Sequence, residues 1–269
     1  MENGGRKIKT IRLFKCGYCV NNLHQIIKKS PRKKIEFPAL SVYLEHEKYG
    51  NILFDTGYSE AIYKNGLVSK IYNLLNKTYI DSCNQIDNKL CENQINKIDK
   101  IIISHAHPDH IAGLKFFNEY ELITTDDVAK SIKKASLKNL VFKNLIPSGS
   151  ARIKTVKLYE GEHFLKKYFS EIYDVLGDGS IIGVRLDGHS KGQMGLYLAE
   201  YKLFLAADSC WGENFLNCSK DMKFIPRKIQ NDFKAYIENI ENIKELKRDF
   251  PEINVIFSHG NFEEGIYGK

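Results

Sequence analysis

The stretch from Ser104 to His110 holds three histidines and an aspartate, at His105, His107, Asp109 and His110. Imidazole nitrogen is a common ligand of zinc and iron, and carboxylate oxygen suits harder divalent ions. An apolar run at 101–103 comes directly before the stretch. A strand that ends there in a tight turn would direct all four side chains to one point beyond the sheet edge. The pattern therefore favours a metal site over a polar loop that happens to be rich in histidine.

Three later residues have the same placement. His189 lies in a glycine-flanked turn after the apolar segment 181–186, Asp208 follows the run 203–207, and His259 comes one residue after 255–257. In α/β folds the functional residues gather at the carboxyl ends of strands. We therefore expect these three side chains to join the histidine-rich turn. Together they supply enough ligands for two metal ions rather than one.

These motifs resemble those of the metallo-β-lactamase-fold hydrolases. The turn matches that superfamily's HxHxDH motif, the three later residues match its single ligands, and Asp55-Thr56-Gly57 matches its upstream Asp-Thr-Gly motif. The nearest likeness in motifs is to the N-acyl homoserine lactonases and related lactonases. The matched positions extend over nearly the whole chain.

The resemblance implies a four-layer αββα sandwich with a dinuclear metal site. One ion would be held by His105, His107 and His189, the other by Asp109, His110 and His259, and both by Asp208. Asp55 would support the ligand turn without binding metal, because a carboxylate behind a ligating imidazole orients the ring. Zinc is the expected metal, with iron and manganese as alternatives, since sites of nitrogen and oxygen ligands discriminate weakly between divalent ions.

The resemblance also implies a metal-dependent hydrolase acting on a small molecule. A hydroxide shared by the two metals would cleave an ester-type bond, a lactone above all, and Asp109 would relay a proton to the leaving group. Lactonases carry a tyrosine three residues after the bridging aspartate, where this chain has Trp211. An aromatic residue that precedes the ligand aspartate in some lactonases is replaced here by Pro108. We expect Trp211 and Pro108 to contact the substrate.

Several other functions share parts of this pattern. Thioester hydrolases of the glyoxalase II type have a C-terminal helical substrate domain for which this chain has no obvious room. Nucleases of the ribonuclease Z type use an RNA-binding arm, and no basic-aromatic segment here supplies one. Flavodiiron oxidoreductases have glutamate where this chain has His107, and a non-catalytic metal sensor would have lost ligands. The hydrolase interpretation is therefore preferred.

Alternating apolar segments indicate a single α/β domain over residues 1–269. Strands are expected at 11–15, 40–46, 51–55, 100–104, 151–158, 181–186, 195–199, 203–207 and 254–257. The first three strands should form an antiparallel meander. Helices are expected at 59–77, 90–96, 111–117, 125–134 and 226–249. In the last of these, apolar residues recur at helical spacing and should cover one face of a sheet.

Composition narrows the setting of the protein. Hydrophobic residues make up 43% of the chain, which is enough for a sizeable core. No apolar run approaches the roughly 20 residues of a membrane span, and charges interrupt residues 1–15, so we expect a cytoplasmic protein without a membrane partner. The six cysteines do not form a disulfide framework. Cys16 and Cys19 form a CxxC pair without a second pair at zinc spacing, and we expect them to be structural.

The net charge of +7 raises the question of nucleic acid. The lysines and arginines are spread over many segments, with small clusters at 28–29, 32–34 and 133–134. This distribution is typical of a solvated surface rather than of a nucleic-acid groove. We therefore expect no nucleic-acid partner.

Overall fold

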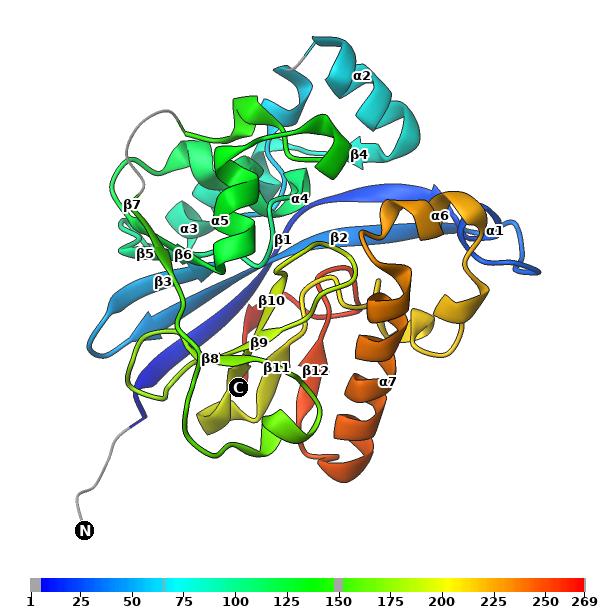
Figure 1. Cartoon of the computed structure of the whole chain (residues 1–269). Helices are drawn as coiled ribbons and strands as arrows, with labels where there is room; N and C mark the ends of the chain where they lie inside the picture. The colour runs from blue at the N-terminus through cyan, green and yellow to red at the C-terminus, as the bar shows by residue number, and fades with distance from the viewer. Residues whose placement is uncertain (1–5, 65, 148–151, 269) are drawn as a thin grey trace.

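The computed structural model describes residues 6–64, 66–147 and 152–268. Two sheets form its centre (Figure 1). The first has the order β13-β1-β2-β3-β5-β6-β7, with β4 paired to β1. Its strands are β1 (Ile8–Asn22), β2 (Lys34–His46), β3 (Gly50–Phe54), β4 (Lys77–Tyr79), β5 (Lys100–Ile102), β6 (Glu121–Thr124), β7 (Arg152–Thr155) and β13 (Gly265–Ile266). The expected antiparallel meander of β1, β2 and β3 is confirmed, and β3, β5, β6 and β7 continue in parallel.

The second sheet has the order β12-β11-β10-β9-β8. Its strands are β8 (Ile172–Asp174), β9 (Ile182–Arg185), β10 (Met194–Leu198), β11 (Leu203–Leu205) and β12 (Asn254–Ile256). The pair β11 and β12 is parallel, and the other pairs are antiparallel. All described strands from β8 to β12 belong to this sheet, whereas β7 and β13 belong to the first.

The period-two alternation of the strands builds three hydrophobic layers. On β3, Ile52 and Phe54 point into the core between the two sheets, where they share a cluster with Leu196 and Leu205 of the second sheet. Leu53, between them, points to the outer face of the first sheet and packs with α3 and α5. One strand therefore contributes to two layers, which is how a sheet can be covered on both faces.

Helices cover the outer faces. Those against the first sheet include α3 (Ile86–Glu92), α4 (Pro108–Ile111) and α5 (Asp126–Lys133). The outer face of the second sheet is covered by α7 (Phe233–Asp249), which buries Tyr236, Ile240, Ile243 and Leu246 along one stripe. The order helix, sheet, sheet, helix is the αββα sandwich that was expected (Figure 1).

Several helix predictions were wrong in their bounds. The helix expected at 226–249 is broken into α6 (Phe224–Ile229) and α7, because Gln230 adopts an extended backbone with ψ 130° and Asp232 caps the start of α7. The segment expected as one helix at 59–77 instead holds a 3-10 helix at Glu60–Lys64, then α2 (Gly66–Leu75) and β4. In the segment 111–117, α4 begins earlier, at Pro108, and a 3-10 helix follows it.

Other differences involve short elements. The helix expected at 90–96 is α3, which ends at Glu92, because the left-handed backbone of Gln94 stops it. Strands β4, β6, β8 and β13 and helix α1 (Leu23–Ile26) were not predicted, and each has four residues or fewer. Within the strand expected at 151–158, residue 151 lies outside the described residues, and β7 ends at Thr155. Among the described residues, no helix has the length and apolar character needed to cross a bilayer.

The two cysteines of the CxxC pair pack into different hydrophobic layers. Cys16 belongs to the cluster outside the first sheet, and Cys19 to the cluster that includes α7. Burial raises the pKa of both thiols, that of Cys19 to about 12. Cys16 contacts the Asp-Thr-Gly turn. The Cys16 carbonyl accepts a hydrogen bond from Tyr58 N at 2.9 Å, and the Cys16 side chain lies so close to Gly57 that a Cβ on Gly57 would overlap it. The pair is built into the core rather than arranged for redox chemistry or metal binding.

Candidate metal centre

The functional side chains predicted from the sequence meet where several strands end. Asp55 follows β3, the histidine-rich turn follows β5, His189 lies between β9 and β10, Asp208 follows β11, and His259 follows β12. Pro108 starts α4, where its missing N–H costs no hydrogen bond, so Asp109 and His110 fall in the first helical turn. The strand ends of both sheets therefore contribute to one site.

The first group of side chains consists of three buried histidines. The Nδ1 atom of His107 lies 3.0 Å from His105 Nε2 and 2.9 Å from His189 Nε2. Burial, followed by neighbouring histidines, lowers the pKa of His105 and His107, that of His107 to about 3, and burial also lowers the pKa of His189. All three rings are therefore neutral near pH 7. Three neutral imidazoles that direct ring nitrogens to one point form a suitable cradle for a transition metal.

The second group combines two carboxylates and two histidines. Asp109, His110, Asp208 and His259 each place one possible ligand atom within 4.8 Å of the others. Asp208 lies between the two groups, because its Oδ2 atom is 3.3 Å from His189 Nε2 and 3.0 Å from His259 Nε2. Its Oδ1 atom is 3.4 Å from His110 Nε2. Asp208 is thus placed where one carboxylate can serve both groups.

Hydrogen bonds on the far side of the rings fix which nitrogen faces the centre. The carbonyl of Pro38 accepts from His259 Nδ1 at 2.7 Å, and Gln230 Oε1 accepts from His189 Nδ1 at 2.9 Å. Asp55 Oδ2 accepts from His110 Nδ1 at 2.7 Å. A ring that donates from Nδ1 keeps Nε2 available as a ligand atom. The three Nε2 atoms therefore face the centre.

Asp55 acts on a fourth ring through Ser104. The Ser104 hydroxyl donates to Asp55 Oδ2 at 2.7 Å, so its oxygen can accept from His105 Nδ1 at 3.0 Å. Ser104 N also donates to Asp55 Oδ1 at 2.8 Å. The fully buried carboxylate therefore orients His110 directly and His105 indirectly. This geometry fits the supporting role of Asp55, which stays a prediction.

Sequence reasoning missed two of these partners, Ser104 and Gln230. Ser104 directly precedes the first histidine, so its position was a usable signal. Gln230 was placed inside a continuous helix, yet it lies at the break between α6 and α7 and reaches back to His189. Nothing in the local sequence marks that break as part of the site.

The electrostatics of the second group favour a bound cation. Burial lowers the pKa of His110 and of His259, but the carboxylates of Asp109 and Asp208 outweigh it, raising the His110 pKa well above its usual range and that of His259 to about 10. Burial would raise the pKa of Asp109 and Asp208, yet the two histidines hold both well below their usual range. Two carboxylates in a buried position require positive charge beside them, either as protons on the rings or as metal ions.

Two orphaned atoms support the same conclusion. Within the described part of the chain, His110 Nε2 and Asp208 Oδ1 are buried and make no hydrogen bond, although they lie 3.4 Å from each other. Buried polar atoms are almost always paired, and a cation bound between them is one explanation for an exception. Both atoms belong to the second group. The residues present therefore fit two divalent cations.

The two residues proposed for substrate contact differ in position. Trp211 is partly buried, with its ring centroid 6.4 Å from that of His189 and 6.2 Å from that of Phe37. It therefore borders the metal ligands and also packs on the core. Pro108 is buried at the start of α4. Both substrate contacts remain predictions.

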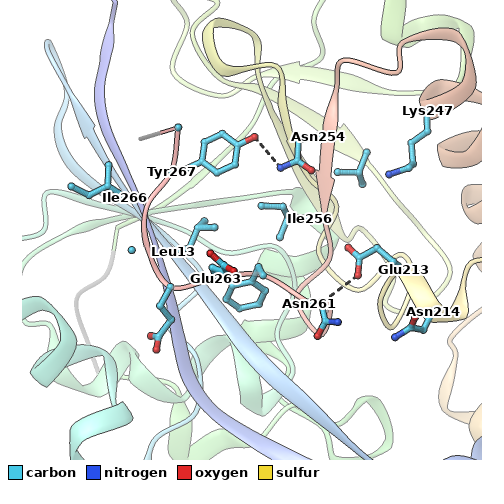
Figure 2. Close-up of a pocket in the computed structure, with 15 residues that line it drawn as sticks. Leu13, Glu213, Asn214, Lys247, Asn254, Ile256, Asn261, Glu263, Ile266 and Tyr267 are labelled. Atoms are coloured by element: carbon cyan, nitrogen blue, oxygen red, sulfur yellow. Dashed lines mark hydrogen bonds between the residues drawn. The ribbon is translucent and has the colours of Figure 1, made fainter.

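A separate pocket of about 510 Å³ lies between the C-terminal segment and β12 (Figure 2). It is lined largely by the C-terminal segment 261–268 and by β12, and Glu213 at its rim accepts from Asn261 N at 3.2 Å. None of the seven predicted metal ligands lines it. The pocket is therefore distinct from the two ligand clusters.

Comparison with known proteins agrees with this geometry. A sequence model of the metallo-β-lactamase superfamily matches residues 35–121. That region contains both the Asp-Thr-Gly turn and the histidine-rich turn. The two packed sheets of the whole chain have the arrangement expected for this fold. The chain has the metallo-β-lactamase fold. A search of curated protein sequences finds no match.

Solved structures with the metallo-β-lactamase fold align along almost the whole chain. An N-acyl homoserine lactone hydrolase with N-hexanoyl-L-homoserine at its catalytic metal centre aligns with a TM-score of 0.71 and 20% identity, covering 94% of each chain. A dizinc quorum-quenching lactonase gives 0.63 and 15%, covering 95% of this chain and 88% of its own. A probable metal-dependent hydrolase from Staphylococcus aureus gives 0.65 and 15%, covering 94% and 90%. At these identities the likeness establishes the fold.

Proposed function

We propose that the protein is a metal-dependent hydrolase that cleaves an ester-type bond in a small molecule, and that the preferred substrate is a lactone. The observation that carries the proposal is the pair of ligand groups joined by Asp208 at the strand ends. Structures of the same fold hold a lactone-hydrolysis product at a metal centre and, in another case, two zinc ions. These likenesses support the substrate class and the dinuclear site as proposals for this chain.

The first metal would be held by His105, His107 and His189, and the second by Asp109, His110 and His259. Asp208 would be shared, because its Oδ2 atom lies near both His189 and His259. When bound, two divalent cations provide a nucleophilic hydroxide near neutral pH and polarise the carbonyl under attack. Zinc is the first choice because imidazole and carboxylate ligands suit it, and the same ligands also accept iron or manganese.

Asp109 is the residue to which we assign proton transfer. Its side chain is 10% exposed, whereas those of Asp208 and Asp55 are 2% and 1% exposed. A carboxylate that exchanges a proton with a leaving group must reach the substrate side of the site. Asp109 is the most exposed of these three carboxylates, so we assign it the proton transfer and assign Asp208 and Asp55 the positioning of the metals and the rings.

A hydrolysis screen tests the proposal. Protein reconstituted with zinc is assayed against lactones, thioesters, β-lactams and phosphodiesters, with Asp208→Ala as the matched inactive variant. We expect lactone hydrolysis that disappears in the variant and on treatment with a chelator. Efficient phosphodiester cleavage with no action on lactones or thioesters would instead assign the site to a nuclease, which is the main alternative function.

A further inference from the structure

The excess of basic over acidic residues in the chain is concentrated in two short segments. Residues 21–37 and 218–230 contain nine lysines and arginines against two acidic residues, Glu36 and Asp221. The excess equals the net charge of the whole protein, +7. Outside these segments acidic and basic residues balance. The clusters at 28–29 and 32–34 are therefore half of one larger feature rather than a part of an evenly charged surface.

The fold brings the two segments together. Lys28 N donates to the Asp221 carbonyl at 2.9 Å, and Lys223 N donates to the Ile26 carbonyl at 2.8 Å. These bonds join the tip of the β1–β2 hairpin and α1 to the start of α6 (Figure 1). The basic corner, as we call this region, carries seven exposed cationic side chains: Lys28, Lys29, Arg32, Lys33, Lys34, Lys223 and Lys228. Over the described ranges, none of the seven has a carboxylate partner within 4.0 Å.

Large apolar side chains project from the same corner. Phe224 is 72% exposed, Ile225 69% and Ile229 40%. Ile225 and Ile229 are four residues apart and share a face of α6. Single exposed apolar residues are ordinary, but three on one short helix beside seven cations that lack a carboxylate partner need an explanation.

A second apolar stripe lies nearby. On α2, Leu67, Ile71, Leu74 and Leu75 are spaced for one helix face, and each is more than half exposed. Strand β4 follows α2 directly and pairs with β1 at Tyr18, Cys19 and Val20, shortly before α1. Figure 1 shows α2 and α6 toward the same end of the long β1–β2 hairpin. A second set of exposed apolar side chains therefore lies toward the same end of the hairpin as the basic corner.

We propose that the basic corner binds the surface of an anionic phospholipid bilayer, with Phe224, Ile225 and Ile229 inserted among the lipids. Cationic side chains beside exposed apolar ones are the combination that holds proteins at the interface of a charged membrane without crossing it. This differs from the absence of a membrane partner expected from sequence, which rested on the lack of a spanning segment. Surface binding requires none.

The chemistry of the corner favours lipid over two other partners. Nucleic acid would use the cations, but isoleucine side chains cannot stack on bases and would remain exposed beside the phosphates. A second copy of the chain would cover the apolar residues, but a symmetric pair would place two strongly basic corners against each other. Only an anionic, partly apolar surface satisfies both features.

Membrane binding at this corner would place lipid beside the proposed site. Helix α6 ends at Ile229, and the next residue, Gln230, accepts from His189 Nδ1. A substrate that partitions into the bilayer could then reach the ligand groups without crossing much water. The binding itself does not depend on the proposed hydrolysis, and its test needs no assay of activity.

The test is co-sedimentation of the full chain with vesicles of phosphatidylcholine, alone or containing phosphatidylglycerol, at low and high salt. One variant reverses charge in the corner, Lys33→Glu with Lys34→Glu, and a second removes the apolar contacts, Phe224→Ser with Ile225→Ser. The matched control makes the same charge change at the end of α5, Lys133→Glu with Lys134→Glu. All substituted residues are exposed, and circular dichroism confirms that each variant is folded.

We expect binding to the phosphatidylglycerol vesicles that falls at high salt, because screening weakens exposed charge interactions. The corner charge variant should bind about tenfold or more weakly, since each cation near an anionic membrane contributes about 1 kcal/mol. The apolar variant should also bind more weakly, and the α5 control should bind like the native protein.

Failure of the native protein to bind, or equal loss in the control, overturns the proposal. A dimer that Phe224→Ser abolishes without vesicle binding would assign the corner to self-association. Tighter binding to an oligonucleotide than to vesicles would assign it to nucleic acid.

Discussion

The buried Asp55 carboxylate illustrates how a residue outside both ligand groups can organise them. It accepts from His110 Nδ1, from Ser104 N and from the Ser104 hydroxyl. Asp55 has a left-handed backbone with φ +57°, and so does Ala207, next to Asp208, with φ +47°. Non-glycine residues in this region are uncommon and cluster at functional sites, where the surroundings hold them in place. Both central carboxylates are thus attached to constrained backbone.

Replacing Asp55 by Asn tests its role behind the histidines. The amide lacks the charge and one of the acceptor oxygens, so the rings of His105 and His110 lose their shared anchor. We expect metal affinity to fall about ten- to hundredfold, measured by competition with a chromogenic chelator. Asp99→Asn is the matched control, because Asp99 also accepts from a backbone N–H, that of Asn51, but lies outside the site. Equal metal affinity in the two variants would contradict the role.

Trp211 is the residue where substrate choice should show. We expect Trp211→Phe to change turnover or substrate range, because the ring borders His189, while metal content and thermal stability stay close to native. Kinetics per folded molecule, metal analysis and a thermal melt distinguish a role of Trp211 in substrate binding from a role in packing. A large loss of stability with unchanged kinetics would show that the tryptophan serves packing alone.

All seven candidate ligands could be predicted from the sequence, because they lie in segments that follow strands, and the structure brings those strand ends together. Gln230 could not, because its contact with His189 depends on a helix break that no Gly or Pro marks. The Cys16–Cys19 pair shows the opposite problem, since its spacing suggests a joint function, but the bulged strand β1 directs the two thiols into different layers.

At the scale of elements, the turn after β9 and the helix α7 are fitted closely together. Gly188 has φ +133°, and a Cβ there would overlap the backbone of Tyr236, which is fully buried on α7. The Asp232 N–H, at the start of α7, donates to the Gly188 carbonyl at 2.8 Å, and Asn231 N donates to the His189 carbonyl at 3.2 Å. The position of His189 therefore depends on where α7 begins.

Gly188→Ala should destabilise the protein more than its backbone conformation alone explains. Gly265→Ala is the control, because Gly265 has a similar positive φ, +124°, but nothing lies within 4 Å of its missing Cβ. We expect the control to lower the free energy of unfolding by roughly 1 kcal/mol and Gly188→Ala by about 1–3 kcal/mol more, measured by urea denaturation. Equal losses would mean that Tyr236 does not restrict the turn.

The elements that sequence could predict were those with strong periodicity, such as the central strands and the stripe on α7. Helix bounds were less accessible, because α2, α4 and α6 are each set by contacts made after the chain folds. Strand β4, for example, exists only because β1 is long enough to pair with it beyond the edge of the sandwich.

At the scale of the whole molecule, the two sheets each supply part of one site. Asp55 and the histidine-rich turn follow strands of the first sheet, and His189, Asp208 and His259 follow strands of the second. The site can therefore form only when the sheets pack face to face, and bound metal should stabilise that packing through ligands from both. The net positive charge of the molecule lies apart from the site, because the excess basic residues are at the basic corner rather than among the two ligand groups.

The most direct test of the central claim is the metal content of the reconstituted protein, measured by elemental analysis after removal of loosely bound ions. The two ligand groups predict two transition-metal ions per chain, and Asp208→Ala should weaken the retention of both, because its carboxylate lies between them. A reproducible content near one ion per chain, or full retention of two ions by Asp208→Ala, would contradict the shared dinuclear site.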